Sequence, residues 1–305
     1  MQIPVIDFKT YDEAKPESIT ELGEQVSDAL TGLGFMAVTH IGVEPERLAK
    51  IFAASKAFFM QPDEVKNACA YTNPEDNFGF QGMLQEHLDP TRPADLKEAF
   101  TMRSPFKYSM DDTRWPSSEF RELILDFYQL CMQCAFKVLR AFAASLGVEK
   151  DFFVQYHNGE NVTLRLLHYP SSGADISSPE QLGAGAHTDY GVITLLFQDN
   201  VGGLEVQDRD GVWQPVDYVE NAIVVNTGDL MERWTNGKFR STKHRVQPKI
   251  GQQERYSIAM FVDPDDDTPV SVLDSCTSAD NPGKYPPITA GEHILEKIRA
   301  SQGYY

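Results

Sequence analysis

Hydrophobic residues recur at helical spacing in several stretches of the chain. Over 19–33 they keep the three- and four-residue spacing of one helix face, and Gly34 follows as a stop signal. A second stretch, 45–59, carries a proline in its first turn, where a helix tolerates it. The longest stretch, 118–146, is followed by a glycine, which is typical of a helix C-terminus. These patterns predict three helices, and 291–301 predicts a fourth that closes the chain.

Short β-type runs separated by turn residues fill the region from 162 to 272. Asp210-Gly211 and Asn236-Gly237 each lie between strand-like runs, which is the strongest short signal for a hairpin. Many short strands with such turns indicate a sandwich or a barrel. The clearest predicted strands are 192–197, 222–226, 241–246 and 255–262.

The first third of the chain has a mixed pattern. Short strands are predicted at 4–8 and 35–41, and 72–95 is predicted to be a loop that carries aromatic residues. We therefore expect one compact unit of mainly β structure with α-helices. A mixed α/β region over 1–105 would pack on a core over 106–305 that contains the long helix, the β region and the closing helix.

The composition is that of a globular protein. Of the 305 residues, 41% are hydrophobic, which is enough for a large core. The formal net charge is -18 and the basic residues are scattered, so we expect no nucleic-acid or anionic-membrane partner. We expect no signal peptide, and no apolar run approaches the ~20 residues that a membrane span needs. A reduced, cytoplasmic protein is expected, as a monomer or a weak homo-oligomer.

Cys131 and Cys134 have the spacing of a metal-binding or redox motif. No second pair of this kind and no neighbouring histidine motif accompanies them. They also share one stripe of the predicted long helix with Phe127 and Val138. Because buried cysteines behave as small hydrophobic residues, we interpret both as core residues.

A possible metal site is formed by His187-x-Asp189 and by His244, which lies on another predicted strand. Residues i and i+2 of a strand point to the same side, so His187 and Asp189 can reach one ion. Two histidines and one carboxylate leave half of an octahedral metal open, which is typical of non-haem Fe(II) oxygenases. A structural zinc site would instead use four ligands, often thiolates.

Arg255 and Ser257 follow at the start of the predicted strand 255–262, and alternation places both side chains on one face. Arginine suits bidentate recognition of a carboxylate, and the serine hydroxyl adds a donor. The following residues are apolar on both faces, so an arginine at this position needs an anionic partner. The pattern predicts a carboxylate-binding site beside the metal.

Taken together, these residues resemble the superfamily of 2-oxoglutarate- and Fe(II)-dependent dioxygenases that includes isopenicillin N synthase. The resemblance covers nearly the whole chain and is closer to fungal and bacterial members than to the plant hormone and flavonoid enzymes. It extends over 4–8, 34–43, 166–170, 186–196, 202–206, 225–229, 241–246, 255–257 and 288–292.

The resemblance implies a double-stranded β-helix, or jelly roll, that holds Fe(II) on His187, Asp189 and His244. It implies that 2-oxoglutarate chelates the iron and that Arg255 and Ser257 bind its distal carboxylate. O₂ would take the remaining position. Succinate and CO₂ would be released while a small-molecule substrate is oxidised, usually by hydroxylation, with desaturation or ring closure as variants.

One position departs from the family pattern. Plant members carry Asn-x-Tyr in the strand before the metal motif, and both side chains assist 2-oxoglutarate. Here Leu167 replaces the asparagine and Tyr169 is kept. Alternation places Arg165 on the same face. We therefore expect Tyr169 to contact the co-substrate, and Arg165 either to bind 2-oxoglutarate or a substrate carboxylate or to pair with an acidic neighbour.

Four apolar residues are candidates for the substrate pocket, although aromatic residues at such positions are as often core residues. Several functions also remain open. Besides the dioxygenase, the same residues fit an oxidase like isopenicillin N synthase, an ethylene-forming enzyme, or a non-catalytic metal-binding protein of the same fold. The pocket candidates are Phe78, Phe80, Leu195 and Phe261.

Overall fold

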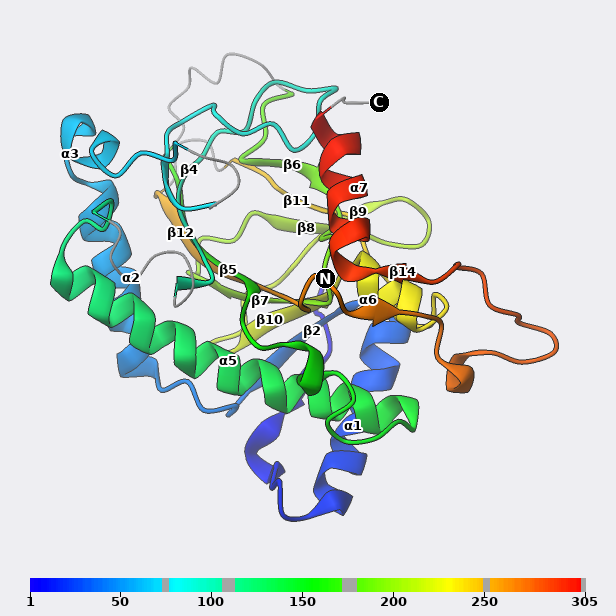
Figure 1. The fold of residues 1–305 in the computed structure, drawn as a ribbon. Helices are drawn as coiled ribbons and strands as arrows, with labels where there is room; N and C mark the ends of the chain where they lie inside the picture. Colours follow the sequence, from blue (N-terminus) through cyan, green and yellow to red (C-terminus); the bar gives the residue numbers. More distant parts are fainter. Residues whose placement is uncertain (73–76, 106–112, 172–179, 249–252, 303–305) are drawn as a thin grey trace.

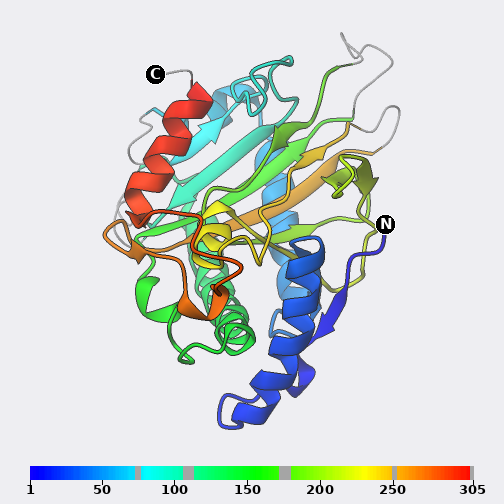
Figure 2. The same cartoon turned by 90° about the vertical axis from the view of Figure 1, so that its right-hand side faces the viewer.

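Two β-sheets that face each other form the centre of the molecule, and most helices lie on the outer side of the larger sheet (Figures 1 and 2). The structure is a computed structural model that describes residues 1–72, 77–105, 113–171, 180–248 and 253–302. No helix among these residues is long and apolar enough to cross a membrane.

The larger sheet has eight strands, all antiparallel to their neighbours except the first pair. Strands from the first third of the chain form both of its ends, so the mixed N-terminal region extends the same sheet. In spatial order the strands are β1 (Val5–Asp7), β2 (Phe35–Thr39), β10 (Ile223–Thr227), β7 (Ile193–Gln198), β12 (Arg255–Asp263), β5 (Asn161–Tyr169), β4 (Glu98–Arg103) and β3 (Gly79–Gln81).

The smaller sheet has four strands and carries both histidines of the predicted metal site. Its strands are β6 (Ala184–His187), β11 (His244–Val246), β8 (Leu204–Gln207) and β9 (Trp213–Pro215), in that order. Asp210 and Gly211 turn the chain between β8 and β9, which confirms the predicted hairpin. A separate pair of strands joins β13 (Pro269–Val270) to β14 (Ile288–Thr289).

The predicted helices are present. The longest, α5, lies across the outer face of the larger sheet (Figure 1). It begins after Ser117, whose hydroxyl accepts the Phe120 N–H, and ends at Gly147, which has the left-handed φ of 66° that glycine adopts without strain. Cys131 and Cys134 are fully buried in it as free thiols, as predicted. The α-helices whose bounds lie within the described residues are α1 (Pro16–Gly32), α2 (Pro45–Phe59), α3 (Asp63–Asn67), α5 (Ser118–Leu146), α6 (Asp229–Trp234) and α7 (Ala290–Gln302).

Strand alternation gives the larger sheet two different faces. On β12, Tyr256 and every second residue after it enter the main hydrophobic core beneath α5. Arg255 and the residues that alternate with it face the smaller sheet instead. We call this second surface the inner face. Its β12 residues are Arg255, Ser257, Ala259, Phe261 and Asp263.

Two local predictions were incomplete or wrong. Asn236-Gly237 does not close a hairpin but follows α6, and both residues have a left-handed φ, of 55° and 79°. Hairpin turns and helix ends need the same backbone conformation, so the dipeptide does not distinguish them. The predicted loop 72–95 contains β3, while its residues 73–76, like the start of the predicted core at 106–112, lie outside the described residues.

Candidate metal and carboxylate site

His187, Asp189 and His244 come together between the two sheets. His187 ends β6, His244 begins β11, and the two residues are direct partners in the strand register. One potential ligand atom from each of the three residues lies within 4.8 Å of the others. Both histidine Nε2 atoms approach the same oxygen, Asp189 Oδ1, at 3.8 Å and 3.7 Å. Among the described residues, this is the one group of His, Cys, Asp and Glu that could hold a metal ion.

Backbone carbonyls orient both imidazole rings. His187 Nδ1 donates to the Gly185 carbonyl at 2.7 Å, and His244 Nδ1 donates to the Thr242 carbonyl at 3.1 Å. Each ring therefore presents Nε2 with its lone pair to the common point. Burial, and then the neighbouring His244, lower the pKa of His187 to about 3, so its imidazole is neutral, as a metal ligand must be.

The two oxygen atoms of the Asp189 carboxylate have different contacts. Its Oδ2 accepts two hydrogen bonds of 2.6 Å, one from the Thr194 hydroxyl on β7 and one from the Asn226 amide on β10. Its Oδ1 remains directed at the histidines. Burial would raise the pKa of Asp189, but the two histidines and these donors lower it below its ordinary value. Asp189 is therefore ionised and held in one orientation.

Arg255 is a buried cation without an acidic partner. Only 3% of its surface is exposed, and it donates to Ser257 Oγ at 3.1 Å and to Gln198 Oε1 at 3.3 Å. Its guanidinium lies 4.7 Å from the centre of the Tyr169 ring, and its Nε has no partner. No carboxylate among the described residues forms an ion pair with it. A small cavity opens beside it, lined by Leu96, Tyr169, Pro170, Gly183, Gln247, Pro248, Gln253 and Arg255.

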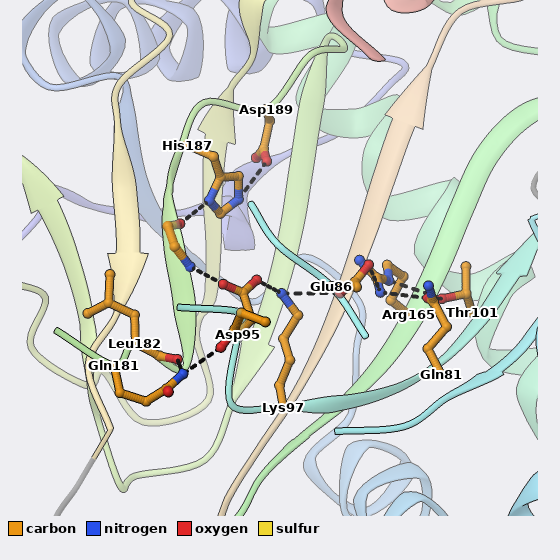
Figure 3. A network of polar contacts seen from close by, with 12 residues as sticks. Gln81, Glu86, Asp95, Lys97, Thr101, Arg165, Gln181, Leu182, His187 and Asp189 are labelled. Atoms are coloured by element: carbon orange, nitrogen blue, oxygen red, sulfur yellow. Dashed lines mark hydrogen bonds and ion pairs between the residues drawn. The ribbon is translucent and has the colours of Figure 1, made fainter. Parts of the chain in front are cut away.

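Arg165 lies on the inner face as expected, but it is paired with an acidic neighbour. It contacts Glu86 at 2.7 Å and donates to the Thr101 hydroxyl at 3.1 Å (Figure 3). Glu86 in turn contacts Lys97 at 3.1 Å. Burial would raise the pKa of Glu86, but Arg165 and Lys97 lower it to about 2. Of the alternatives for Arg165, the structure favours the ion pair.

The same chain of polar contacts reaches the metal site. Lys97 also contacts Asp95 at 2.6 Å, and Asp95 accepts the Gly185 N–H at 2.9 Å. Gly185 is the residue whose carbonyl orients His187. Figure 3 shows this path from Arg165 to His187. Lys97 and Asp95 therefore support β6 directly behind a candidate ligand.

Three of the four pocket candidates do not lie at the site. Phe78 and Phe80 belong to an aromatic cluster in the main core. There Phe78 contacts Phe100, and Phe80 contacts Phe58. Leu195 also faces that core, because its neighbour Thr194 points inward to Asp189 and successive strand residues point to opposite faces. These three predictions were wrong. Phe261 is on the inner face and is half-buried.

Sequence reasoning missed four polar residues that surround the site. Asn226 and Thr194 hold Asp189, Gln198 contacts Arg255, and Asp263 lies at the far end of β12. The available signal was their position within otherwise apolar strands. A buried polar side chain in such a strand needs a partner, and that partner is often functional.

Comparison with known proteins agrees with this arrangement. Residues 154–264 match the model of the 2OG-Fe(II) oxygenase superfamily, and residues 3–120 match that of the N-terminal region of non-haem dioxygenases in morphine synthesis. The chain is 34% identical to the 2-oxoglutarate-Fe(II) type oxidoreductase hxnY of Emericella nidulans, over 98% of this chain and 90% of that protein.

Solved structures of relatives have the same fold. A full-length Neurospora crassa protein, crystallised in complex with alpha-KG and thymine, is 31% identical and has a TM-score of 0.87 over 98% of this chain and 97% of its own. The rice dioxygenase for auxin oxidation is 29% identical, with a TM-score of 0.77 over 99% and 96% of the two chains. The chain thus belongs to the 2-oxoglutarate- and Fe(II)-dependent oxygenases, and it is a jelly-roll oxidoreductase that uses Fe(II) and 2-oxoglutarate.

Proposed function

We propose that this dioxygenase hydroxylates a small molecule, with His187, Asp189 and His244 as its iron ligands and Arg255 as the anchor of 2-oxoglutarate. Bound Fe(II) and 2-oxoglutarate supply O₂ activation: one oxygen atom enters the substrate and the other enters succinate as CO₂ leaves. Family membership supports the reaction class. The residue assignments rest on the geometry of the site.

The three side chains fit Fe(II) by their chemistry. They offer two neutral imidazole nitrogens and one carboxylate oxygen, a set that suits iron and leaves positions for other ligands. Each ligand is held by a hydrogen bond on its far side, to Gly185, Thr242 or the Thr194–Asn226 pair. Such contacts keep the ligands in place whether or not an ion is bound.

The single observation that carries the co-substrate assignment is the unpaired guanidinium of Arg255. A buried cation without a counter-ion is costly, so this position needs an anion. A carboxylate can take two parallel hydrogen bonds from arginine, and Ser257 can donate a third. Tyr169 contributes by lying against the guanidinium and limiting its rotation.

Arg165 has a different part in this proposal. Because it is paired with Glu86, it supports the Lys97–Asp95 path behind His187 and does not bind 2-oxoglutarate directly. Leu167, which replaces the amide usual in plant relatives, is buried against Ala99 and Tyr169. It therefore offers 2-oxoglutarate an apolar contact where those enzymes offer a hydrogen bond.

The test is the binding of 2-oxoglutarate to the Arg255→Met variant. Loss of a buried bidentate ion pair costs about 3–5 kcal/mol, so affinity should fall at least a hundredfold, to order of magnitude. Anaerobic titration of the Fe(II) protein, followed by its visible charge-transfer band, measures that affinity. Succinate release in air then separates a dioxygenase from an oxidase that needs no 2-oxoglutarate.

Arg209→Met is the matched control, because Arg209 is exposed and its one polar contact within the described part of the chain is a hydrogen bond to the Thr31 carbonyl. It should bind 2-oxoglutarate as the unmodified protein does. Arg255→Met with unchanged affinity would refute the anchor. If the unmodified protein showed neither the band nor succinate, the dioxygenase assignment itself would fail.

A further inference from the structure

Asp263 is a carboxylate at the iron end of the inner face. It is the last residue of β12 and lies on the same side of the strand as Phe261 and Arg255. Phe261 is paired with Thr194, whose hydroxyl holds Asp189. Asp263 is therefore two residues beyond the row of the sheet that supports the metal ligand.

The Asp263 side chain packs against the chain segment that follows Asp189. A Cβ atom on Gly191 would lie 1.3 Å from Asp263 Oδ1, so only glycine permits this close approach. The backbone N–H of Val192 hydrogen-bonds to the carboxylate. The backbone of the loop that carries the metal ligand therefore fixes the position of the Asp263 side chain.

The carboxylate nevertheless lacks a side-chain partner. Among the described residues, no side chain forms a hydrogen bond or an ion pair with it. Arg103 is near enough to lower its pKa, but it donates its hydrogen bond to Asn161 instead. The stronger effects of burial and of Asp189 raise the pKa of Asp263 to about 7. With one backbone donor among the described residues, the two carboxylate oxygens keep acceptor capacity that a group from outside the chain can use.

The inner face of β12 is oppositely charged at its two ends. Arg255 and Asp263 are eight residues apart, which corresponds to about 26 Å between their Cα atoms at the usual strand rise. The iron ligands lie near the Asp263 end. A dianion such as 2-oxoglutarate is attracted to Arg255 and repelled by Asp263. The molecule that approaches iron from the Asp263 end meets an acceptor instead of a cation.

We propose that Asp263 is a specificity residue of the substrate pocket, where it accepts a hydrogen bond from an ammonium, N–H or hydroxyl group of the molecule being oxidised. This inference rests on the proposed function and deepens it. Phe261, half-buried two residues earlier, provides an apolar ring against which such a molecule can lie. A substrate that presents a carboxylate at this point is disfavoured by both Asp263 and Asp189.

The test compares binding to the full-length protein and to its Asp263→Asn variant, both loaded anaerobically with Fe(II) and 2-oxoglutarate. Calorimetry measures binding of benzylamine, thymine and benzyl alcohol, one donor of each kind. Their partners without a donor are benzyltrimethylammonium, 1,3-dimethylthymine and benzyl methyl ether. At least one donor should bind the unmodified protein about tenfold more tightly than its donor-free partner does. The same donor should bind the unmodified protein about tenfold more tightly than it binds the Asp263→Asn variant. Which donor does so identifies the class.

Asp267→Asn is the control, since Asp267 is an exposed carboxylate four residues further along. It should leave every affinity unchanged. The proposal is overturned if no donor binds more weakly to Asp263→Asn, or if the donor-free partners bind equally well. The charge-transfer band of 2-oxoglutarate should persist in all three proteins. Its absence from the unmodified protein would instead refute the proposed function.

Discussion

Thr194→Val isolates one of the two hydrogen bonds that hold the candidate iron ligand Asp189. Valine has nearly the shape of threonine, so the change removes the hydroxyl that donates to Asp189 Oδ2 at 2.6 Å without opening a cavity. Thr194 is buried, and water cannot readily replace the lost donor. The Asn226 amide remains, so the carboxylate keeps a weaker tether.

The expected magnitude follows from that geometry. A hydrogen bond to a charged group contributes about 1.5–3 kcal/mol to stability, and a residue that supports a metal ligand typically accounts for about tenfold to hundredfold in metal affinity. Because Asn226 retains half of the support, we expect the iron dissociation constant to rise about tenfold. The free energy of unfolding of the metal-free protein should fall by about 1–2 kcal/mol.

Anaerobic competition with a chromogenic chelator measures the Fe(II) affinity, and urea unfolding measures stability. Thr163→Val is the matched control. Thr163 is in the same row of the sheet, as the partner of Phe261 on β5, and has no hydrogen bond to the metal site among the described contacts. Thr194→Ser should recover most of the affinity, since it keeps the hydroxyl.

Two results would contradict this reasoning. If Thr194→Val bound Fe(II) within a factor of about three of the unmodified protein, the hydrogen bond would not position the ligand. If Thr163→Val weakened binding as much, the effect would come from the sheet and not from Asp189.

Two further changes test the charged interior. Lys97→Met leaves the buried Asp95 carboxylate without its cation and Glu86 with Arg165 alone, so the free energy of unfolding should fall by about 3–5 kcal/mol in urea; a loss below about 1 kcal/mol would refute the network. Burial lowers the pKa of His157 to about 4. Since the unfolded chain binds that proton near pH 6.5, the part of the stability that depends on His157 should fall by about 3 kcal/mol as the pH drops from 6.5 to 4, and it should be constant above this range. His157→Asn, whose amide can still donate to the Phe153 carbonyl, should remove this part of the pH dependence, and equal acid sensitivity in both proteins would exclude His157 as its source.

The long helix and the central strands were predictable because their patterns are local. The 118–146 helix has a serine before it, a glycine after it and one apolar face, and the structure begins and ends it at the predicted residues. The proximity of His187 and Asp189 was also predicted from their spacing, although β6 ends at His187 and Asp189 lies just beyond it, in the loop to β7. The spacing of Arg255 and Ser257 placed them on one face for the same reason.

The remaining site residues could not be predicted because their partners are distant in sequence. Asn226 meets Asp189 only when β10 and β7 pair, and Glu86, in the segment between β3 and β4, meets Arg165 on β5 across 79 residues of sequence. The side of the sheet to which a side chain points could not be predicted either, because the sequence did not fix the strand boundaries. Leu195 was assigned to the pocket although its neighbour Thr194 occupies that side.

The origin of the three candidate ligands gives the iron a mechanical role. Two come from the smaller sheet, on β6 and β11, while the third is tied to β7 and β10 of the larger one. An ion on all three therefore joins the halves of the jelly roll, and its affinity depends on the spacing between them. A substitution far from any ligand can then tune iron retention if it changes how closely the sheets approach. The same ion would restrict fluctuations of the distance between the two sheets, and with them the size of the space that is left for a substrate.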